Sequence, residues 1–127
     1  MTGGSGMQSL GEAVQRYFDL MYDCDTSRFD RVFGPTAQLH GFRDGAMSMW
    51  PAQQYKEILA ARPSPKSLGA PRLEEILLMD FASPTQALVK VRVRINNIVF
   101  VDYLTYHRID GQWLITGKGY HVESRDP

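Results

Sequence analysis

The sequence has a single cysteine, no net charge and no long apolar run, and each of these absences excludes a class of protein. Cys24 alone cannot form an intramolecular disulfide, so a packed core must hold the fold. Fourteen basic residues balance fourteen acidic ones, so no overall field favours nucleic acid or an anionic membrane as a partner. No apolar stretch approaches the roughly 18 residues of a membrane span. The absence of a basic and then apolar leader favours a cytoplasmic protein.

The length indicates one domain. A chain of 127 residues can bury about two-thirds of the surface that it exposes when unfolded, which is enough for one core. Met1 to Ser9 contains four glycine or serine residues before Met7, and we expect a flexible N-terminus or a cloning remnant there. Residues 10–127 are then predicted to form a single domain without repeats.

Three helices are predicted in the first half of the chain. Apolar residues recur at helical spacing from Leu10 to Tyr22, opposite a polar side. Asp25-Thr26-Ser27 offers N-caps for a short second helix, which Gly34-Pro35 is expected to end. Pro51 suits the first position of a third helix that ends near Ala61. The following segment, residues 62–71, contains three prolines and is predicted to be a rim loop.

Strand-like runs surround the third helix and fill the second half of the chain. Their apolar alternation and the turn signals between them predict β-hairpins. Helices followed by a long meander indicate an α+β fold with the helices gathered on one face of a curved sheet. The predicted strands are residues 36–42, 46–50, 72–81, 85–95, 98–109 and 112–123.

The last two runs flank Asp110-Gly111, which predicts a two-residue turn and so fixes the register of the hairpin. Ile109 then lies opposite Gln112. One face is dominated by large apolar residues and is expected to turn inward, while Lys118 and Tyr120 point outward or into a dimer contact. The inward face is predicted to carry Phe100, Asp102, Leu104, Tyr106, Trp113, Ile115, Gly117, Gly119 and His121.

An aspartate on a covered face needs a partner, because a buried carboxylate without one is costly. In this register Asp102 lies opposite Gly119 and diagonal to His121, at roughly 7 to 8 Å. Gly117 and Gly119 lack side chains and would leave a hollow in the sheet wall. We therefore expect a ligand pocket beside Asp102 and His121, and a purely structural Asp-His pair fits the same pattern.

Two stretches of the chain resemble a known family. "AVQRYFDLMYDCDTSRFDRVFGPTAQLHGFRDG" and "FVDYLTYHRIDGQWLITGKGYHVE" resemble the putative lumazine-binding family, within the nuclear transport factor 2-like superfamily of cystatin-like fold. That superfamily also contains ketosteroid isomerases, scytalone dehydratase and SnoaL-like polyketide cyclases. The resemblance, over residues 10–123, implies a cone: a strongly bent antiparallel sheet wrapped around three helices, with a pocket in its mouth. It selects no activity, because the same fold hosts enzymes and binders.

The resemblance also implies roles for single residues. Tyr17 is similar to the first-helix tyrosine with which ketosteroid isomerases donate to an oxyanion, and Asp102 resembles their protonated aspartic acid. The place of their general-base aspartate falls at Gly41, so a steroid isomerase is not expected. His40 beside it is our candidate base, because imidazole titrates near neutral pH. A core tyrosine and a half-buried strand histidine fit the same positions.

We predict a small-molecule-binding protein with a partly apolar pocket, no cofactor and no metal, forming a homodimer through the open face of its sheet. One alternative is an isomerase or dehydratase/cyclase in which His40 moves a proton while Tyr17 and Asp102 stabilise an enolate. Another is a non-catalytic dimerisation module whose pocket its own side chains fill. The predicted catalytic residues are Tyr17, His40, Asp102 and His121, and the predicted ligand-binding residues are Phe42, Tyr55, Phe100 and Trp113.

Overall fold

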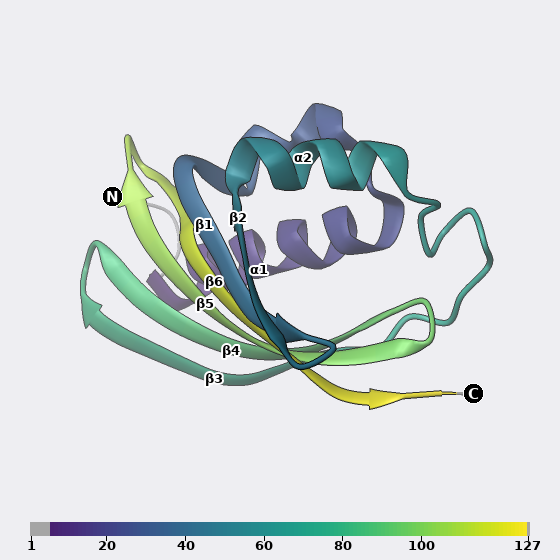
Figure 1. The fold of residues 1–127 in the computed structure, drawn as a ribbon. Helices are drawn as coiled ribbons and strands as arrows, with labels where there is room; N and C mark the ends of the chain where they lie inside the picture. Colours follow the sequence, from purple (N-terminus) through teal and green to yellow (C-terminus); the bar gives the residue numbers. More distant parts are fainter. Residues whose placement is uncertain (1–5, 127) are drawn as a thin grey trace.

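The structure, a computed structural model, describes residues 6–126. A bent six-stranded sheet curls around helices that lie on one of its faces (Figure 1), so the predicted α+β fold is confirmed. Among residues 6–126 no helix has the length and apolar character to cross a membrane. The helices are α1 Gly6–Asp23, the 3-10 helix η1 Thr26–Arg31 and α2 Ala52–Ala61. The strands are β1 Phe33–Arg43, β2 Ala46–Pro51, β3 Glu74–Ser83, β4 Gln86–Ile95, β5 Ile98–Ile109 and β6 Gln112–Arg125.

The starts of two elements differ from the prediction by three residues or more. Helix α1 begins at Gly6, so residues 6–9 of the predicted flexible start form its first turn, and residues 1–5 lie outside the described residues. Strand β1 begins at Phe33 and therefore includes Gly34-Pro35, which we expected between the elements. The ladder between β1 and β6 is irregular from Phe33 to Gln38. Pro35 has no backbone N–H, and the strand tolerates it there because no regular ladder hydrogen bond is lost.

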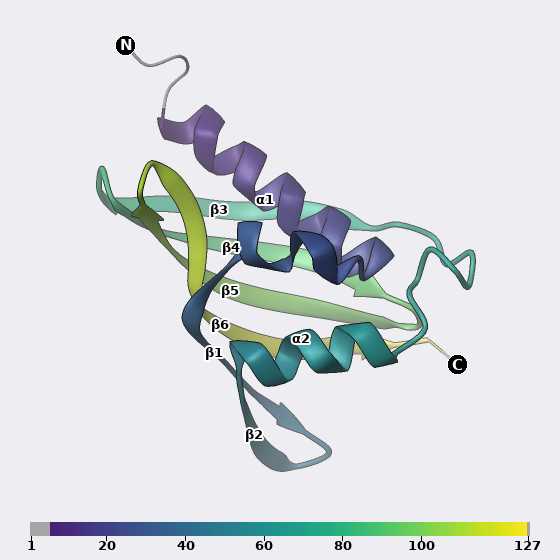
Figure 2. The same cartoon turned by 90° about the horizontal axis from the view of Figure 1, so that it is seen from above.

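The sheet has the strand order β2-β1-β6-β5-β4-β3. The four strands from β3 to β6 form the predicted antiparallel meander. The first strand, β1, instead pairs with β6 in parallel, so the prediction of a wholly antiparallel sheet is wrong at this one pair. Figure 2 shows the consequence: the chain's last strand lies beside β1, and α1 and α2 lie over the same face of the sheet.

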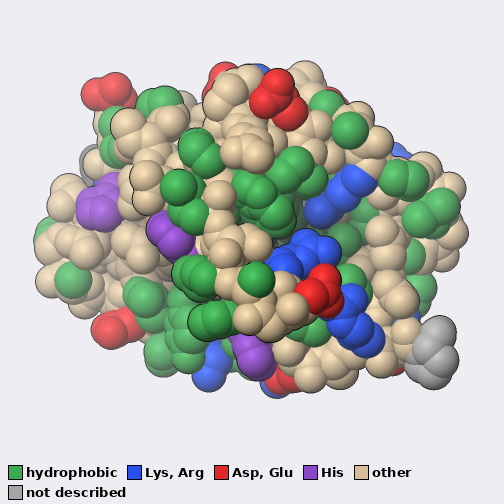
Figure 3. Space-filling view, in the orientation of Figure 1, with side chains coloured by type: hydrophobic (Ala, Val, Ile, Leu, Met, Phe, Trp, Pro, Cys, Tyr) green, Lys and Arg blue, Asp and Glu red, His purple; other side chains and the backbone are tan. Residues whose placement is uncertain are grey.

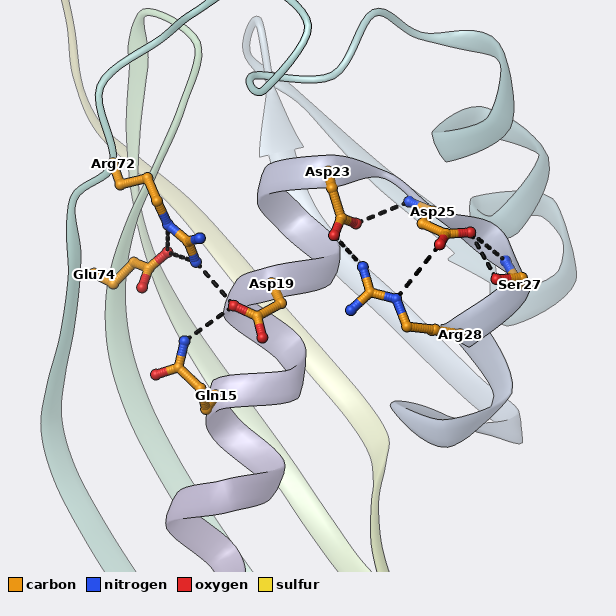
Figure 4. A network of polar contacts seen from close by, with 8 residues as sticks. All are labelled: Gln15, Asp19, Asp23, Asp25, Ser27, Arg28, Arg72 and Glu74. Atoms are coloured by element: carbon orange, nitrogen blue, oxygen red, sulfur yellow. Dashed lines mark hydrogen bonds and ion pairs between the residues drawn. The ribbon is translucent and has the colours of Figure 1, made fainter.

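Two polar networks hold the C-terminal half of α1 in place (Figure 4). In the first, Asp19 accepts hydrogen bonds from Gln15 at 3.1 Å and from Arg72 at 3.0 Å, and Arg72 also pairs with Glu74 of β3. The second closes the corner between α1 and η1, and it consists of Asp23, Asp25, Ser27 and Arg28. These groups are partly exposed, so the networks orient the helix more than they stabilise it.

Candidate functional site

A β-bulge in β6 decides which side chains of the last hairpin face the core. From the turn to Tyr106 and Ile115 the strands pair as predicted, with Ile109 opposite Gln112. The register then shifts by one residue, because Thr105 pairs with Gly117 and Thr116 is left over. A shift of one residue moves the next side chains of β6, from Gly117 to Val122, to the opposite face of the sheet, up to a second shift after Val122.

The predicted contact between Asp102 and His121 is therefore wrong. Asp102 pairs with Tyr120, whereas His121 pairs with Val101 and is exposed on the outer face, the face of the sheet away from the helices. The predicted hollow at Gly117 and Gly119 is also wrong, since both residues belong to that outer face. The glycine inside the strand pattern at position 117 was the one sequence signal for a bulge.

Asp102 lies instead in a buried polar cluster with Tyr17 and Lys118. The Tyr17 hydroxyl donates to Asp102 Oδ2 at 2.6 Å, and Lys118 Nζ lies 3.8 Å from the same oxygen. Asp102 is 1% exposed and Lys118 is 6% exposed. Asp102 Oδ1 has no hydrogen-bond partner among the described residues. The structure thus brings Tyr17 and Asp102 together and adds Lys118, which the predicted register had placed outside.

Burial dominates the electrostatics of this cluster. It raises the pKa of the Asp102 carboxyl, and the opposing effects of Lys118 and of the hydrogen bond from Tyr17 are smaller. Burial and the charge of Asp102 raise the pKa of the Tyr17 hydroxyl well above its usual value, so this phenol stays protonated and donates. Lys118 Nζ also lies 5.0 Å from the ring centre of Tyr17 and 5.1 Å from that of Tyr55, where both rings stabilise its charge.

Lys118 also lines a pocket. The cavity has a volume of about 50 Å³, which holds a few water molecules at roughly 10–15 Å³ each. Three aromatic rings form one wall of the cavity. Trp50 stacks on Tyr120 with ring centres 5.9 Å apart, and Phe100 packs edge-on against Tyr120 with ring centres 6.3 Å apart. Figure 3, in the orientation of Figure 1, shows basic side chains next to hydrophobic ones around a depression in the middle of the molecule's visible face. The remaining lining residues are Leu39, Arg43, Tyr55, Ile58, Arg62 and Ile95.

Gly41 makes room for the aromatic wall. A Cβ atom at this position would lie 2.5 Å from the nearest carbon of the Tyr120 ring, closer than any real contact. The position to which the resemblance assigns the general-base aspartate is therefore occupied by the ring of Tyr120. An aspartate could stand there only if that ring moved.

A wider hollow lies between η1 and β1, with a volume of about 390 Å³. Its lining residues include Asp30 and Gln53 but no cationic side chain. A ligand site usually combines an apolar wall with a few convergent polar groups. The smaller pocket combines an aromatic wall with the buried ammonium of Lys118, so it is the candidate site.

The structure separates the predicted site residues into four groups. Tyr55 and Phe100 line the pocket, and Tyr17 and Asp102 lie behind Lys118 without lining it. Trp113 is buried against Phe81, at a ring distance of 6.0 Å, away from the pocket. The others, exposed on the outer face, are His40, Phe42 and His121.

The aromatic and cationic pocket residues that were not predicted as site residues are Lys118, Tyr120, Trp50, Arg43 and Arg62. Lys118 and Tyr120 were assigned to the wrong face by the missing bulge. Trp50 ends the predicted strand of residues 46–50, where a pocket lip and ordinary core fit the sequence and core was the better fit. Arg43 ends β1 and Arg62 comes directly after α2, and only the folded chain brings these two ends to the same pocket.

Comparison with known proteins supports the fold and one family. A family model described as "Putative lumazine-binding" matches residues 6–121. The curated protein Aldolase FrzH from Cladobotryum sp is 27% identical over 111 residues, which cover 86% of this chain and 85% of that protein.

Solved structures resemble the fold over nearly the whole chain. An NTF-2 like protein of unknown function from Silicibacter pomeroyi DSS-3 superposes with a TM-score of 0.81 at 20% identity, covering 97% of this chain and all of that one (100%). A ketosteroid isomerase-like protein from Erwinia carotovora atroseptica SCRI1043 superposes with a TM-score of 0.74 at 10% identity, covering 95% and 98%. The chain therefore has the NTF2-like fold, and identities this low carry no further conclusion.

Proposed function

The chain belongs to the family described as "Putative lumazine-binding", and from that premise we propose that it binds a small, flat, partly apolar molecule in the pocket at Lys118. The observation that carries the proposal is the position of Lys118, buried at an aromatic pocket. Its Nζ is 3.8 Å from Asp102 Oδ2, longer than the roughly 2.7–2.9 Å of a charge-assisted hydrogen bond. The ammonium therefore retains donor capacity for an oxygen of the ligand.

The pocket must widen to accept such a ligand. A bicyclic molecule needs more room than about 50 Å³. Trp50 is half-buried and belongs to β2, an edge strand that pairs with β1 alone. An outward movement of Trp50 would open the wall and place its ring, with that of Tyr120, against the face of the ligand.

Substitution of Lys118 by methionine tests the proposal. We expect lumazine, or another flat molecule with a carbonyl oxygen, to bind the native protein and to bind Lys118→Met at least about tenfold more weakly, because an N–H donor to the ligand oxygen is lost. Isothermal titration calorimetry measures both affinities, and circular dichroism checks that the variant is folded.

Lys90→Met is the matched control. Lys90 is also a strand lysine beside a tyrosine, with Nζ 5.6 Å from the ring centre of Tyr103, but it lies on the outer face. Its replacement should leave the affinity unchanged. Equal binding by Lys118→Met and Lys90→Met, or no binding of any flat carbonyl compound by the native protein, would show that Lys118 does not mark a ligand site.

A second candidate function is catalysis through an enolate, supported by the relative named Aldolase FrzH. Aldol chemistry forms a carbon–carbon bond through an enolate, whose oxygen a buried ammonium stabilises. Lys118 could supply this charge, with Asp102 and Tyr17 holding it in place. His40, our predicted base, is exposed on the outer face, so the base would have to be another group.

Deuterium uptake separates catalysis from binding alone. It is measured at the carbon next to the carbonyl of a bound ketone and compared between Lys118→Met and Lys90→Met.

We also propose that the outer face forms a homodimer. It carries exposed apolar side chains, and Phe42 and Met47 are paired across the β1-β2 hairpin with 67% and 56% exposure. The same face bears Arg92 with Glu75 and Glu123, a mixture of charges that can pair with a second copy of itself.

Light scattering after size exclusion should give twice the 14.4 kDa of one chain, and Phe42→Asp should shift the mass to a single chain. A single-chain mass for the native protein at all concentrations would refute the dimer.

A further inference from the structure

Arg62 lines the pocket with two donors that the protein leaves unused. It is the C-cap residue of α2, and its backbone N–H donates to the carbonyl of Ile58 at 3.1 Å, which fixes its position at the end of the helix. Its Nε and Nη2 atoms are shielded from solvent and have no hydrogen-bond partner among the described residues. Shielded polar groups in folded proteins nearly always have a partner, so each exception requires an explanation.

The two unused donors lie on one edge of the guanidinium group. The Nε–H and one Nη2–H bond point in parallel, and this pair matches the two oxygens of a carboxylate. Burial by itself would lower the pKa of Arg62, but the charges of Tyr55 and Cys24 and the polar contacts that the guanidinium makes with them outweigh burial, so the pKa is raised. The group is therefore a permanent cation with a free bidentate edge.

The rest of the pocket also favours an anion. Three cationic side chains line it, Arg43, Arg62 and Lys118, and no aspartate or glutamate does. Among residues 6–126 neither Arg43 nor Arg62 forms an ion pair, whereas Lys118 has Asp102. The hydroxyl of Tyr120, another lining residue, is shielded and unpartnered as well. Residues that carry unpartnered polar atoms and positive charge thus line one aromatic-walled cavity.

We propose that the natural ligand is an aromatic carboxylate, held by its carboxylate on the Nε and Nη2 edge of Arg62 and by its ring against Trp50 and Tyr120. This inference rests on the proposed function, a pocket for flat molecules, and names the class of ligand. A planar carboxylate fits a narrow, aromatic-walled cavity better than a tetrahedral phosphate does, because both its oxygens lie in the plane of the ring.

The test compares ligands of equal shape and different charge. Calorimetry measures the affinity of 2-naphthoate, of the neutral 2-naphthamide and of 2-naphthyl phosphate. We expect the native protein to bind 2-naphthoate at least about tenfold more tightly than the amide, since bonds between charged groups are the stronger ones, and more tightly than the phosphate. In Arg62→Gln the carboxylate and the amide should bind within about twofold of each other.

Two further variants make the result specific. Arg62→Lys keeps the charge but loses the bidentate edge, so it should retain only part of the preference for the carboxylate. Arg94→Gln removes an arginine that pairs with Asp126 outside the pocket, and its preference should equal that of the native protein. Arg62→Lys also serves as the test variant if Arg62→Gln does not fold.

The outcomes separate this inference from the function on which it rests. If none of the three compounds binds the native protein, the proposed binding function fails. If the amide binds as tightly as the carboxylate, or if the preference survives in Arg62→Gln, the pocket binds flat molecules and the carboxylate site is wrong. Tighter binding of the phosphate would also overturn the assignment to a carboxylate.

Discussion

Replacement of Asp102 by alanine is expected to lower the free energy of unfolding by about 3–5 kcal/mol, the range found when one partner of a buried ion pair is removed. The substitution takes the acceptor from the Tyr17 hydroxyl at 2.6 Å and the counter-charge from Lys118 at 3.8 Å. Both groups are buried, so water cannot replace the lost carboxyl. Urea denaturation at pH 7 measures the difference. Asp30→Ala, at an exposed aspartate that pairs with Lys56, is the control and should change stability little.

Asp102→Asn tests the electrostatic part of this expectation. Burial raises the pKa of Asp102 in the folded protein, so its contribution to stability is fully present below its ordinary value of 3.8 and is lost as pH rises through the raised value. Asparagine does not titrate. The stability of Asp102→Asn relative to the native protein should therefore increase as pH rises above about 4. A difference that is constant with pH would contradict the buried, titrating carboxyl.

Gly41→Ala is expected to lower the free energy of unfolding by about 1–3 kcal/mol, the cost of overpacking a well-filled interior. The new Cβ would lie 2.5 Å from the Tyr120 ring, and that ring packs against Trp50 and Phe100. Displacing it would also distort the wall of the pocket, so ligand affinity should fall together with stability. Denaturation and calorimetry on the same preparation measure both effects.

Gly119→Ala is the matched control. Gly119 lies on β6, opposite His40 on the neighbouring β1, and a Cβ there would meet no atom within 4 Å. Alanine at such a site should leave stability unchanged, or raise it by about 0.4–1 kcal/mol because the unfolded chain loses freedom. Equal effects of the two substitutions would show that the faces of β6 are assigned wrongly.

The sequence was sufficient for most features that depend on near neighbours along the chain. The helical spacing from Leu10 to Tyr22, the turn at Asp110-Gly111 and the prolines of residues 62–71 each act within a few residues. These signals were enough for the order of elements and the antiparallel meander. The resemblance to a family, and not spacing, implied that Tyr17 and Asp102, 85 positions apart, belong to one site.

The pocket depended on contacts that no local pattern contains. Strand alternation predicts which residues share a face, but one extra residue, Thr116, inverts that assignment for Gly117 to Val122 of β6. The bulge brought Lys118 inward and sent His121 out, and the parallel pairing of β1 with β6 placed Gly41 beneath Tyr120. The periodicity of helices and strands follows from local backbone geometry, so a short stretch of sequence is enough to predict it. Register is set by the pairing of distant strands, so only the tertiary structure decided which cationic and aromatic side chains line the pocket.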